Sequence, residues 1–184
     1  MTTRLTTPLT DEAVRALRAG QPVLLSGVVY TARDAAHRRF AAELDAGRPL
    51  PVDLAGQALY YVGPSPTAPG AVIGSAGPTS SYRMDPWTPR LLAECGLKAT
   101  IGKGERSPEV VDAMRVHGAV YLATTGGAAA LIAKCIVASE VVWAEDLGPE
   151  AVRRLEVENL PCLVAVDCHG GNLYESGPAE FRVG

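Results

Sequence analysis

Four short segments of the chain combine cationic side chains, hydroxyl groups and glycines in patterns that suit the binding of a small anion. They span residues 31–37, 77–84, 102–104 and 124–128. A guanidinium such as that of Arg33 can hold a carboxylate through two parallel hydrogen bonds, and the ammonium of Lys103 adds a point charge between two glycines that let a ligand approach the backbone. Because the sequence has no Ser-His-Asp order and no His-Glu-x-x-His motif, the segments indicate a pocket for a small dianion.

The segment Gly-Pro-Thr-Ser-Ser-Tyr-Arg-Met, residues 77–84, is the most informative of the four. Its glycine and proline shape a tight turn, after which come Thr79, Ser80 and a third hydroxyl residue, with Arg83 behind them. Hydroxyl groups and backbone N–H groups at such a turn can cradle an anion. The same hydroxyl groups can also cap a helix that begins near Asp85, and the two interpretations are compatible.

The other segments each have a plainer interpretation that the residues alone leave open. Arg33 can be a surface arginine beside Asp34, and His37, one helical turn further on, can face the same site or be a solvated helix residue. Lys103 can be a solvated loop lysine. Residues 124–128 can allow a helix to pack closely on a sheet, and they lack the glycine and lysine spacing of a nucleotide-binding loop.

Apolar strands that alternate with helices place these segments at strand ends. Strands are predicted over residues 22–30, 57–63, 71–77, 97–102, 119–125, the start of 141–148, 161–167 and the end of 168–174. Helices are predicted over residues 11–19, 34–46, 86–95, 107–118, 126–136 and 149–157. This order predicts an α/β fold in which helices cover a mixed, largely parallel sheet. Ligands of open α/β sheets gather at the carboxyl ends of strands, where the four segments fall.

Length, composition and charge restrict the classes of protein that fit. A chain of 184 residues with 47% hydrophobic content predicts one domain, over residues 1–184, with its own core. The net charge of −3, from 17 basic and 20 acidic residues, predicts neither a nucleic-acid-binding nor a membrane-binding surface. The sequence shows no apolar run of about 18 residues and no apolar N-terminal signal, so a cytoplasmic protein is expected.

Four cysteines, Cys95, Cys135, Cys162 and Cys168, are unevenly spaced and form no Cys-x-x-Cys pair. A disulfide framework does not suit a chain of this size with its own core. A three-cysteine cluster site is one interpretation, but the prediction is separate thiols in a reducing cytosol.

Several motifs resemble, in order and with similar spacing, the β-type region of class I fumarases. They are GPTSSYRMDPWTPRLL from residue 77, IGKG from 101, VYLATTGGAAALIAK from 120, EDLGPEAVRRLEVENLPCLVAVD from 145 and GGNLY from 170. The resemblance runs from about residue 5 to residue 181, and it is equally close to the β subunit of L(+)-tartrate dehydratase and of related mesaconate-hydrating enzymes. It implies a swivelling β/β/α domain.

The resemblance also implies a partner and a cofactor. The partner is an α subunit or N-terminal domain that binds a [4Fe–4S] cluster through three cysteines of its own, in an α2β2 assembly. This chain would bind no cluster itself and would act only with the partner, as the β subunit of a hydro-lyase for fumarate and L-malate, tartrate or mesaconate. Two other classes stay open: a non-catalytic carboxylate-binding or scaffold module, and a small nucleotide-binding domain that uses residues 124–130.

The site residues of the family map onto this sequence motif by motif. Arg33, in the motif Thr-Ala-Arg-Asp-Ala-Ala-His, and Arg83 are implied to hold the carboxylates of the substrate. Thr79, in the Gly-Pro-Thr motif, is implied to act as the base. Lys103, in the Gly-Lys-Gly motif, is implied to be a second catalytic residue.

Two further residues complete the predicted substrate-binding set. Ser80 stands where family members commonly have a second threonine, and His37 closes the motif that contains the first arginine. A threonine hydroxyl is a poor base by itself. Thr79 is therefore expected to depend on the nearby cations Arg83 and Lys103, or on a group of the partner that takes its proton.

Overall fold

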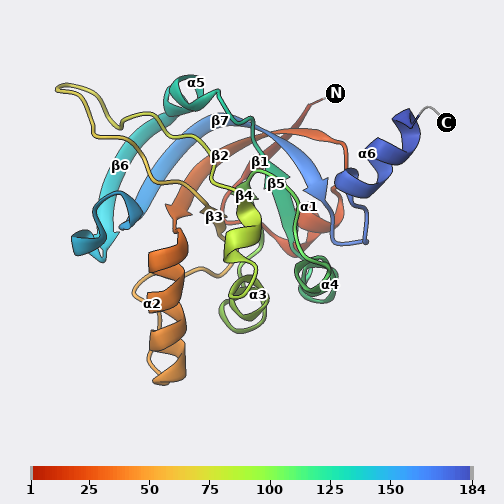
Figure 1. Cartoon of the computed structure of the whole chain (residues 1–184), viewed down its shortest axis with the longest axis horizontal. Coiled ribbons are helices and arrows are strands. Elements are labelled where there is room, and N and C mark those ends of the chain that lie inside the picture. The colour runs from red at the N-terminus through yellow and green to blue at the C-terminus, as the bar shows by residue number, and fades with distance from the viewer. Residues whose placement is uncertain (1, 183–184) are drawn as a thin grey trace.

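Seven strands of the described chain form one sheet, which closes on itself (Figure 1). The computed structural model describes residues 2–182. The strands are β1 (Thr3–Thr6), β2 (Pro22–Thr31), β3 (Ala58–Tyr60), β4 (Ala99–Gly102), β5 (Val120–Ala123), β6 (Ile136–Trp143) and β7 (Val152–Val166). Their order is β1-β2-β3-β4-β5-β7-β6, and a further pairing of β2 with β7 closes β2, β3, β4, β5 and β7 into a barrel. Strands β1 to β5 pair in parallel, whereas β7 runs antiparallel to β2, β5 and β6.

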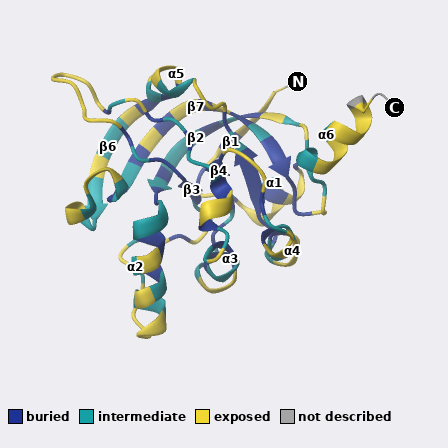
Figure 2. Cartoon of the chain, in the orientation of Figure 1, coloured by how far each residue is buried: buried dark blue, intermediate teal, exposed yellow. Residues whose placement is uncertain are grey.

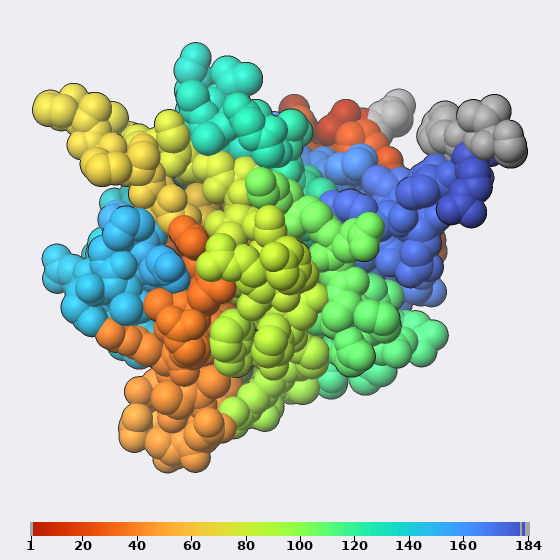
Figure 3. All heavy atoms as spheres, viewed as in Figure 1, coloured from red at the N-terminus to blue at the C-terminus, as the bar shows by residue number. Residues whose placement is uncertain are grey.

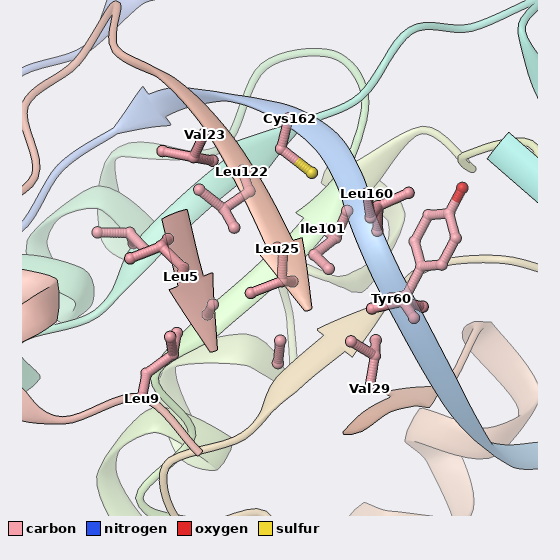
Figure 4. Close-up of a cluster of buried hydrophobic side chains, with 14 of the residues drawn as sticks. Leu5, Leu9, Val23, Leu25, Val29, Tyr60, Ile101, Leu122, Leu160 and Cys162 are labelled. Carbon is pink, nitrogen blue, oxygen red and sulfur yellow. The ribbon is translucent and has the colours of Figure 1, made fainter. Parts of the chain in front are cut away.

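The inside of the barrel is a packed apolar core (Figure 4). Because strand side chains alternate between two faces, every second residue of β2 points inward, namely Val23, Leu25 and Val29. Across the β2–β7 pairing, Leu25 lies opposite Leu160 and Val23 opposite Cys162. Side chains fill the interior as in other small barrels, so a ligand site must lie at an end of the barrel or outside it.

Three helices cover the outer face of the barrel on one side (Figure 1). They are α2 (Asp34–Asp45), α3 (Thr88–Cys95) and α4 (Pro108–His117). They enclose a second apolar cluster, to which Phe40, Leu91 and Met114 contribute from the helices and Tyr121 from the outer face of β5. Figure 2 shows the strands beneath them as buried and the far sides of the helices as exposed.

The predicted ends of α4 are confirmed. The Ser107 side chain accepts a hydrogen bond from the backbone N–H of Val110, Pro108 is the first helical residue, and Gly118 ends the helix with a φ of 61°. The remaining helical elements are α1 (Asp11–Arg15), α5 (Ala129–Ala133), α6 (Leu173–Phe181) and the 3-10 helices η1 (Ser81–Met84) and η2 (Glu145–Glu150). No helix within residues 2–182 is both long and apolar enough to cross a membrane.

The predicted mixed α/β fold is confirmed, but its sheet is a closed barrel rather than an open layer. Parallel pairing holds for the four neighbouring pairs from β1 to β5. The three antiparallel pairings all involve β7, which pairs with both β2 and β5 and so closes the barrel. The predicted domain of residues 1–184 includes residues 1, 183 and 184, which lie outside the described residues.

Three predicted elements are wrong. The helix predicted over 149–157 is largely the first half of β7, because pairing with β2 and β6 outweighs the local helix propensity of its Glu, Ala and Arg residues. Residues 71–77, predicted as a strand, form an irregular loop rich in glycine. The last strand predicted within 168–174 gives way to α6, whose first turn is capped by the Asn172 side chain. Strand β1 was not predicted, because Leu5 is its only apolar residue.

Candidate active site

The four segments singled out in the sequence meet at one edge of the barrel. Parallel neighbouring strands end at the same edge, and β2, β4 and β5 lead into Arg33, Lys103 and Thr124 respectively. The segment 77–84 follows no strand, but it docks at the ends of β3 and β4. In the space-filling view, three of these segments lie side by side on the face turned to the viewer (Figure 3). They are residues 31–37 in orange, 77–84 in yellow-green and 102–104 in green.

Backbone hydrogen bonds hold the turn that carries Thr79 and Ser80. The N–H of Thr79 donates to the carbonyl of Tyr61 (2.7 Å), and the N–H of Lys103 donates to the carbonyl of Thr79 (3.3 Å). The N–H of Ser81 in turn donates to the carbonyl of Lys103 (2.8 Å). Thr79 and Ser80 are half-buried, and within residues 2–182 their hydroxyls make no hydrogen bond. Neither caps η1, so both hydroxyls are available to a ligand.

Arg33 is held beside the end of β3, and its guanidinium makes no hydrogen bond within residues 2–182. Its guanidinium lies against Gly63, where an added Cβ would be 2.7 Å from Nη1. Its Nη2 is 3.8 Å from Oε1 of Glu150, a partner that sequence reasoning missed. The Nε donor is buried and has no hydrogen-bond partner in the described part of the chain. The Arg33 side chain as a whole is 23% exposed, so an incoming carboxylate can reach its guanidinium.

Arg83 is paired with Asp34 in this structure. Its Nε donates to Oδ1 of Asp34 (3.0 Å), and its Nη2 lies 2.9 Å from Oδ2. The carboxylate of Asp34 therefore pairs with Arg83 and not with its sequence neighbour Arg33. Asp34 thus connects the start of α2 to the turn of residues 77–84, and the Arg83 side chain stays 41% exposed.

His37 lies behind Arg33 rather than in solvent. It is fully buried, and its Nδ1 donates to the carbonyl of Arg33 (2.8 Å), which fixes the tautomer because a carbonyl can only accept. Its ring packs against Tyr61 and Trp87, with ring centroids 5.5 and 5.7 Å away. Burial lowers the pKa of His37 to about 4. The solvated alternative is wrong, and the residue is neutral near pH 7.

Lys103 is an exposed cation of the edge. Among the described residues it makes no ion pair, and its side chain lies over Gly126, where an added Cβ would be 3.4 Å from Cδ and 3.7 Å from Nζ. The predicted helix over 126–136 is shortened to the five residues of α5. The segment 124–128 therefore serves as a close support for the lysine.

A buried arginine, missed by sequence reasoning, lies beneath the turn. Arg106 is 7% exposed, and its Nε donates to Oδ1 of Asp85 (2.7 Å). Its other neighbours are the hydroxyls of Thr100 (2.8 Å) and Thr88 (2.9 Å) and the ring centroids of Tyr61 (5.3 Å) and Tyr121 (5.0 Å). No local pattern marks this arginine as buried, because its partners come from several elements.

The cysteines do not form a cluster site within residues 2–182. All four are free thiols, and Cys162 and Cys168 are buried in the core. No three His, Cys, Asp or Glu side chains of the described residues lie together as metal ligands. The donors within residues 2–182 therefore do not fit an iron–sulfur cluster.

Comparisons with known proteins agree with the motif resemblance. A family model described as "Fumarase C-terminus" matches residues 1–177. The chain is 38% identical over 175 residues to a Geobacillus stearothermophilus protein provisionally named class I fumarate hydratase, covering 93% of this chain and 33% of that protein. It is 38% identical over 152 residues to the aerobic class I fumarate hydratase of Escherichia coli K12, covering 82% and 28%.

A relative of similar length comes from Methanocaldococcus jannaschii and is provisionally named L(+)-tartrate dehydratase subunit beta. The identity is 38% over 172 residues, covering 91% of this chain and 88% of that protein. The chain thus spans a third or less of the fumarate hydratases named above but most of this subunit. Because the family match extends over nearly all of its 184 residues, the chain belongs to the fumarase C-terminus family.

Proposed function

We propose that this chain is the β-type part of a hydro-lyase that reversibly adds water to a small dicarboxylate. Fumarate and L-malate are the first candidate pair, and tartrate and mesaconate are the alternatives. Relatives named fumarate hydratase and L(+)-tartrate dehydratase subunit beta support this reaction class. The observation that carries the proposal is that Arg33, Thr79, Arg83 and Lys103 come to one barrel edge with polar atoms still available for a ligand.

The two arginines are suited to the two carboxylates of such a substrate. The Arg33 side chain is 23% exposed, and its contact with Glu150 at 3.8 Å is long enough to yield to a closer carboxylate. Arg83 is held by Asp34 through Nε and Nη2, which leaves Nη1 to reach a second carboxylate. Asp34 would then position Arg83 while the substrate binds.

In the dehydration direction, a base removes a proton from the carbon next to one carboxylate, the C–H electron pair forms the C=C bond, and hydroxide leaves the neighbouring carbon. The proton and the hydroxide together make the water that is released. We assign the proton removal to the Thr79 hydroxyl. Negative charge then develops on the adjacent carboxylate, where the arginine that binds it and Lys103 stabilise it. A threonine hydroxyl is a weak base, so this role requires cations close by or a proton acceptor from a partner.

A partner would hold the cofactor and supply the rest of the site. The cysteines of this chain do not fit a [4Fe–4S] cluster, so the cluster would be held by an α subunit, in an α2β2 assembly. The swivelling β/β/α arrangement implied by the resemblance would bring the edge of residues 33, 79, 83 and 103 against that subunit. This chain would contribute carboxylate binding and proton transfer.

Anaerobic co-expression with the candidate α subunit tests the proposal, through hydration and dehydration assays on fumarate, malate, tartrate and mesaconate. The chain alone should be inactive. In the complex, Thr79→Ala should lower kcat at least about 100-fold, the usual contribution of a positioned base. Arg33→Ala should mainly raise KM. Ser75→Ala, which changes an exposed serine of the neighbouring loop, should leave both parameters unchanged.

Two results would overturn parts of this assignment. A Thr79→Ala complex with near-normal kcat would remove Thr79 as the base. A well-assembled complex that binds these acids through the chain but converts none of them would instead support a non-catalytic carboxylate-binding module.

A further inference from the structure

Two loops of the proposed site share one buried hydroxyl group. Tyr121 lies on the outer face of β5 and is fully buried. Its hydroxyl donates to the carbonyl of Gly104 (2.9 Å) and lies 3.0 Å from the hydroxyl of Ser81, which can donate to it. Gly104 directly follows Lys103, and Ser81 ends the turn that carries Thr79. A single oxygen atom therefore connects the loop of the lysine to the loop of the threonine.

The residues around the Ser81 hydroxyl are tightly packed. An added Cβ on Gly102 would lie 2.0 Å from the Ser81 hydroxyl oxygen and 3.1 Å from the ring of Tyr61, so only a glycine fits there. Burial raises the pKa of Tyr121, which keeps its hydroxyl protonated. A protonated hydroxyl can accept from Ser81 and donate to Gly104 at the same time.

The guanidinium of Arg106 packs over the ring of Tyr121. Its guanidinium carbon lies 5.0 Å from the ring centroid of Tyr121, and its Nε is bound to Asp85. Asp85 also accepts a hydrogen bond from the backbone N–H of Ser107 (2.6 Å), so the arginine and its partner are anchored at both ends. The Tyr121 ring cannot easily follow a movement of either loop.

We propose that Tyr121, supported by Arg106, is a positioning residue that sets the place of Lys103 relative to Thr79. On one side, two backbone hydrogen bonds hold Lys103 to the turn, one with Thr79 (3.3 Å) and one with Ser81 (2.8 Å). On the other side, Tyr121 fixes the next carbonyl, that of Gly104. Because the lysine side chain is exposed and makes no ion pair within residues 2–182, its backbone position decides where its ammonium can reach. The catalytic meaning of this placement rests on the proposed function.

Tyr121→Phe removes only the connecting oxygen and is the test, made in the reconstituted two-subunit enzyme. We expect kcat/KM to fall about tenfold or more, because a displacement of about 1 Å can lower a rate about 100-fold. In a Lys103→Met background the same substitution should have little further effect, since the hydroxyl acts through the lysine.

The control is Thr7→Val, which also removes a buried hydroxyl, one that donates to the carbonyl of Val28 (2.6 Å). Val28 precedes Arg33 by five residues, or roughly 16 Å of extended chain. This control should lower stability without changing kcat or KM.

Amide hydrogen exchange of the chain separates the inference from the proposed function. Tyr121→Phe should speed exchange at the N–H groups of Ser81 and Lys103 by about fivefold, as expected for one lost hydrogen bond, and Thr7→Val should not. Unchanged exchange, or an equal loss of activity with and without Lys103, would overturn the positioning role. Faster exchange in the Tyr121→Phe chain, together with a wild-type complex that hydrates none of the acids, would keep the link between the loops and reject the hydro-lyase.

Discussion

At the scale of single residues, His37 is placed to serve the site without meeting a substrate. Its Nδ1 donates to the carbonyl of Arg33, the residue that precedes α2, and its ring fills the space between Tyr61 and Trp87. It therefore fixes the first turn of α2, and with it the backbone of the arginine. The role of His37 in substrate binding stays a prediction, and its Nε2 is a buried polar atom without a hydrogen-bond partner among the described residues.

We predict that His37→Asn reduces the acid sensitivity of the fold. The pKa of His37 is about 4 when folded, below its ordinary value of 6.5, so between these values only the unfolded chain takes up the proton. The wild-type free energy of unfolding should be fully retained above about pH 6.5. Below that it should fall toward pH 4, by up to about 1.4 kcal/mol per pH unit from this group.

The asparagine amide of this variant can still donate to the carbonyl of Arg33, but it does not titrate. Urea unfolding of both proteins between about pH 7 and pH 4 measures the two slopes. The acidic groups common to both proteins cancel in the comparison. Equal slopes would show that burial of His37 does not govern this part of the pH dependence.

The site residues could be predicted from the sequence, but their partners could not. Arg33 and Lys103 each follow an apolar strand, which is a local pattern. Glu150 contacts Arg33 although it lies 117 positions further along the chain. Asp34 pairs with Arg83 and not with Arg33, its neighbour in the sequence. Such pairings depend on how distant segments meet in space, which no local periodicity encodes.

At the scale of elements, local propensity was a good guide wherever an element is held mainly by its own residues. The helix α4 has its Ser107 cap and its Gly118 end as predicted. The strand β7 shows the opposite case, because its residues 152–157 have helix-forming composition but pair with β2 and β6 on both sides. Hydrogen bonds along both edges of a strand outweigh a propensity difference of about 1 kcal/mol or less per residue.

The close fit of β4 against η1 predicts that a second substitution can restore part of the stability lost through a first. Gly102→Ala should destabilise the fold by about 1–3 kcal/mol, because its Cβ would overlap the Ser81 hydroxyl at 2.0 Å. Adding Ser81→Ala to that variant should recover part of the loss, since the tight contact with the Tyr61 ring at 3.1 Å remains.

Urea unfolding of the two single variants and the double variant measures this coupling. Gly177→Ala is the matched control, because an added Cβ there meets nothing within 4 Å. Its stability should be equal to or above that of the wild type. Strictly additive losses for Gly102→Ala and Ser81→Ala would contradict the overlap.

At the scale of the whole molecule, one long strand turns a parallel sheet into a barrel. Across the β2–β7 pairing, Leu25 lies opposite Leu160 and Gly27 opposite Val157, so Ser26 faces two residues of β7. The additional residue makes a β-bulge, which bends the strand. At this bulge Asn159 has a φ of 51°, in the left-handed region, and its N–H donates to the Ser26 hydroxyl (2.9 Å).

We predict that closure of the barrel depends on the backbone conformation of Asn159 more than on its side chain. Asn159→Gly should change the free energy of unfolding little, since glycine adopts positive φ freely and the lost contact with Arg4 is exposed. Asn159→Val should lower it by about 1–2 kcal/mol, because a β-branched residue is strained there.

Glu158→Val is the control, since Glu158 is an exposed neighbour in β7 without positive φ. Chemical denaturation should show one transition for all variants, because both apolar clusters share the barrel strands. Equal losses for valine at positions 158 and 159 would mean that the bulge conformation does not limit barrel closure.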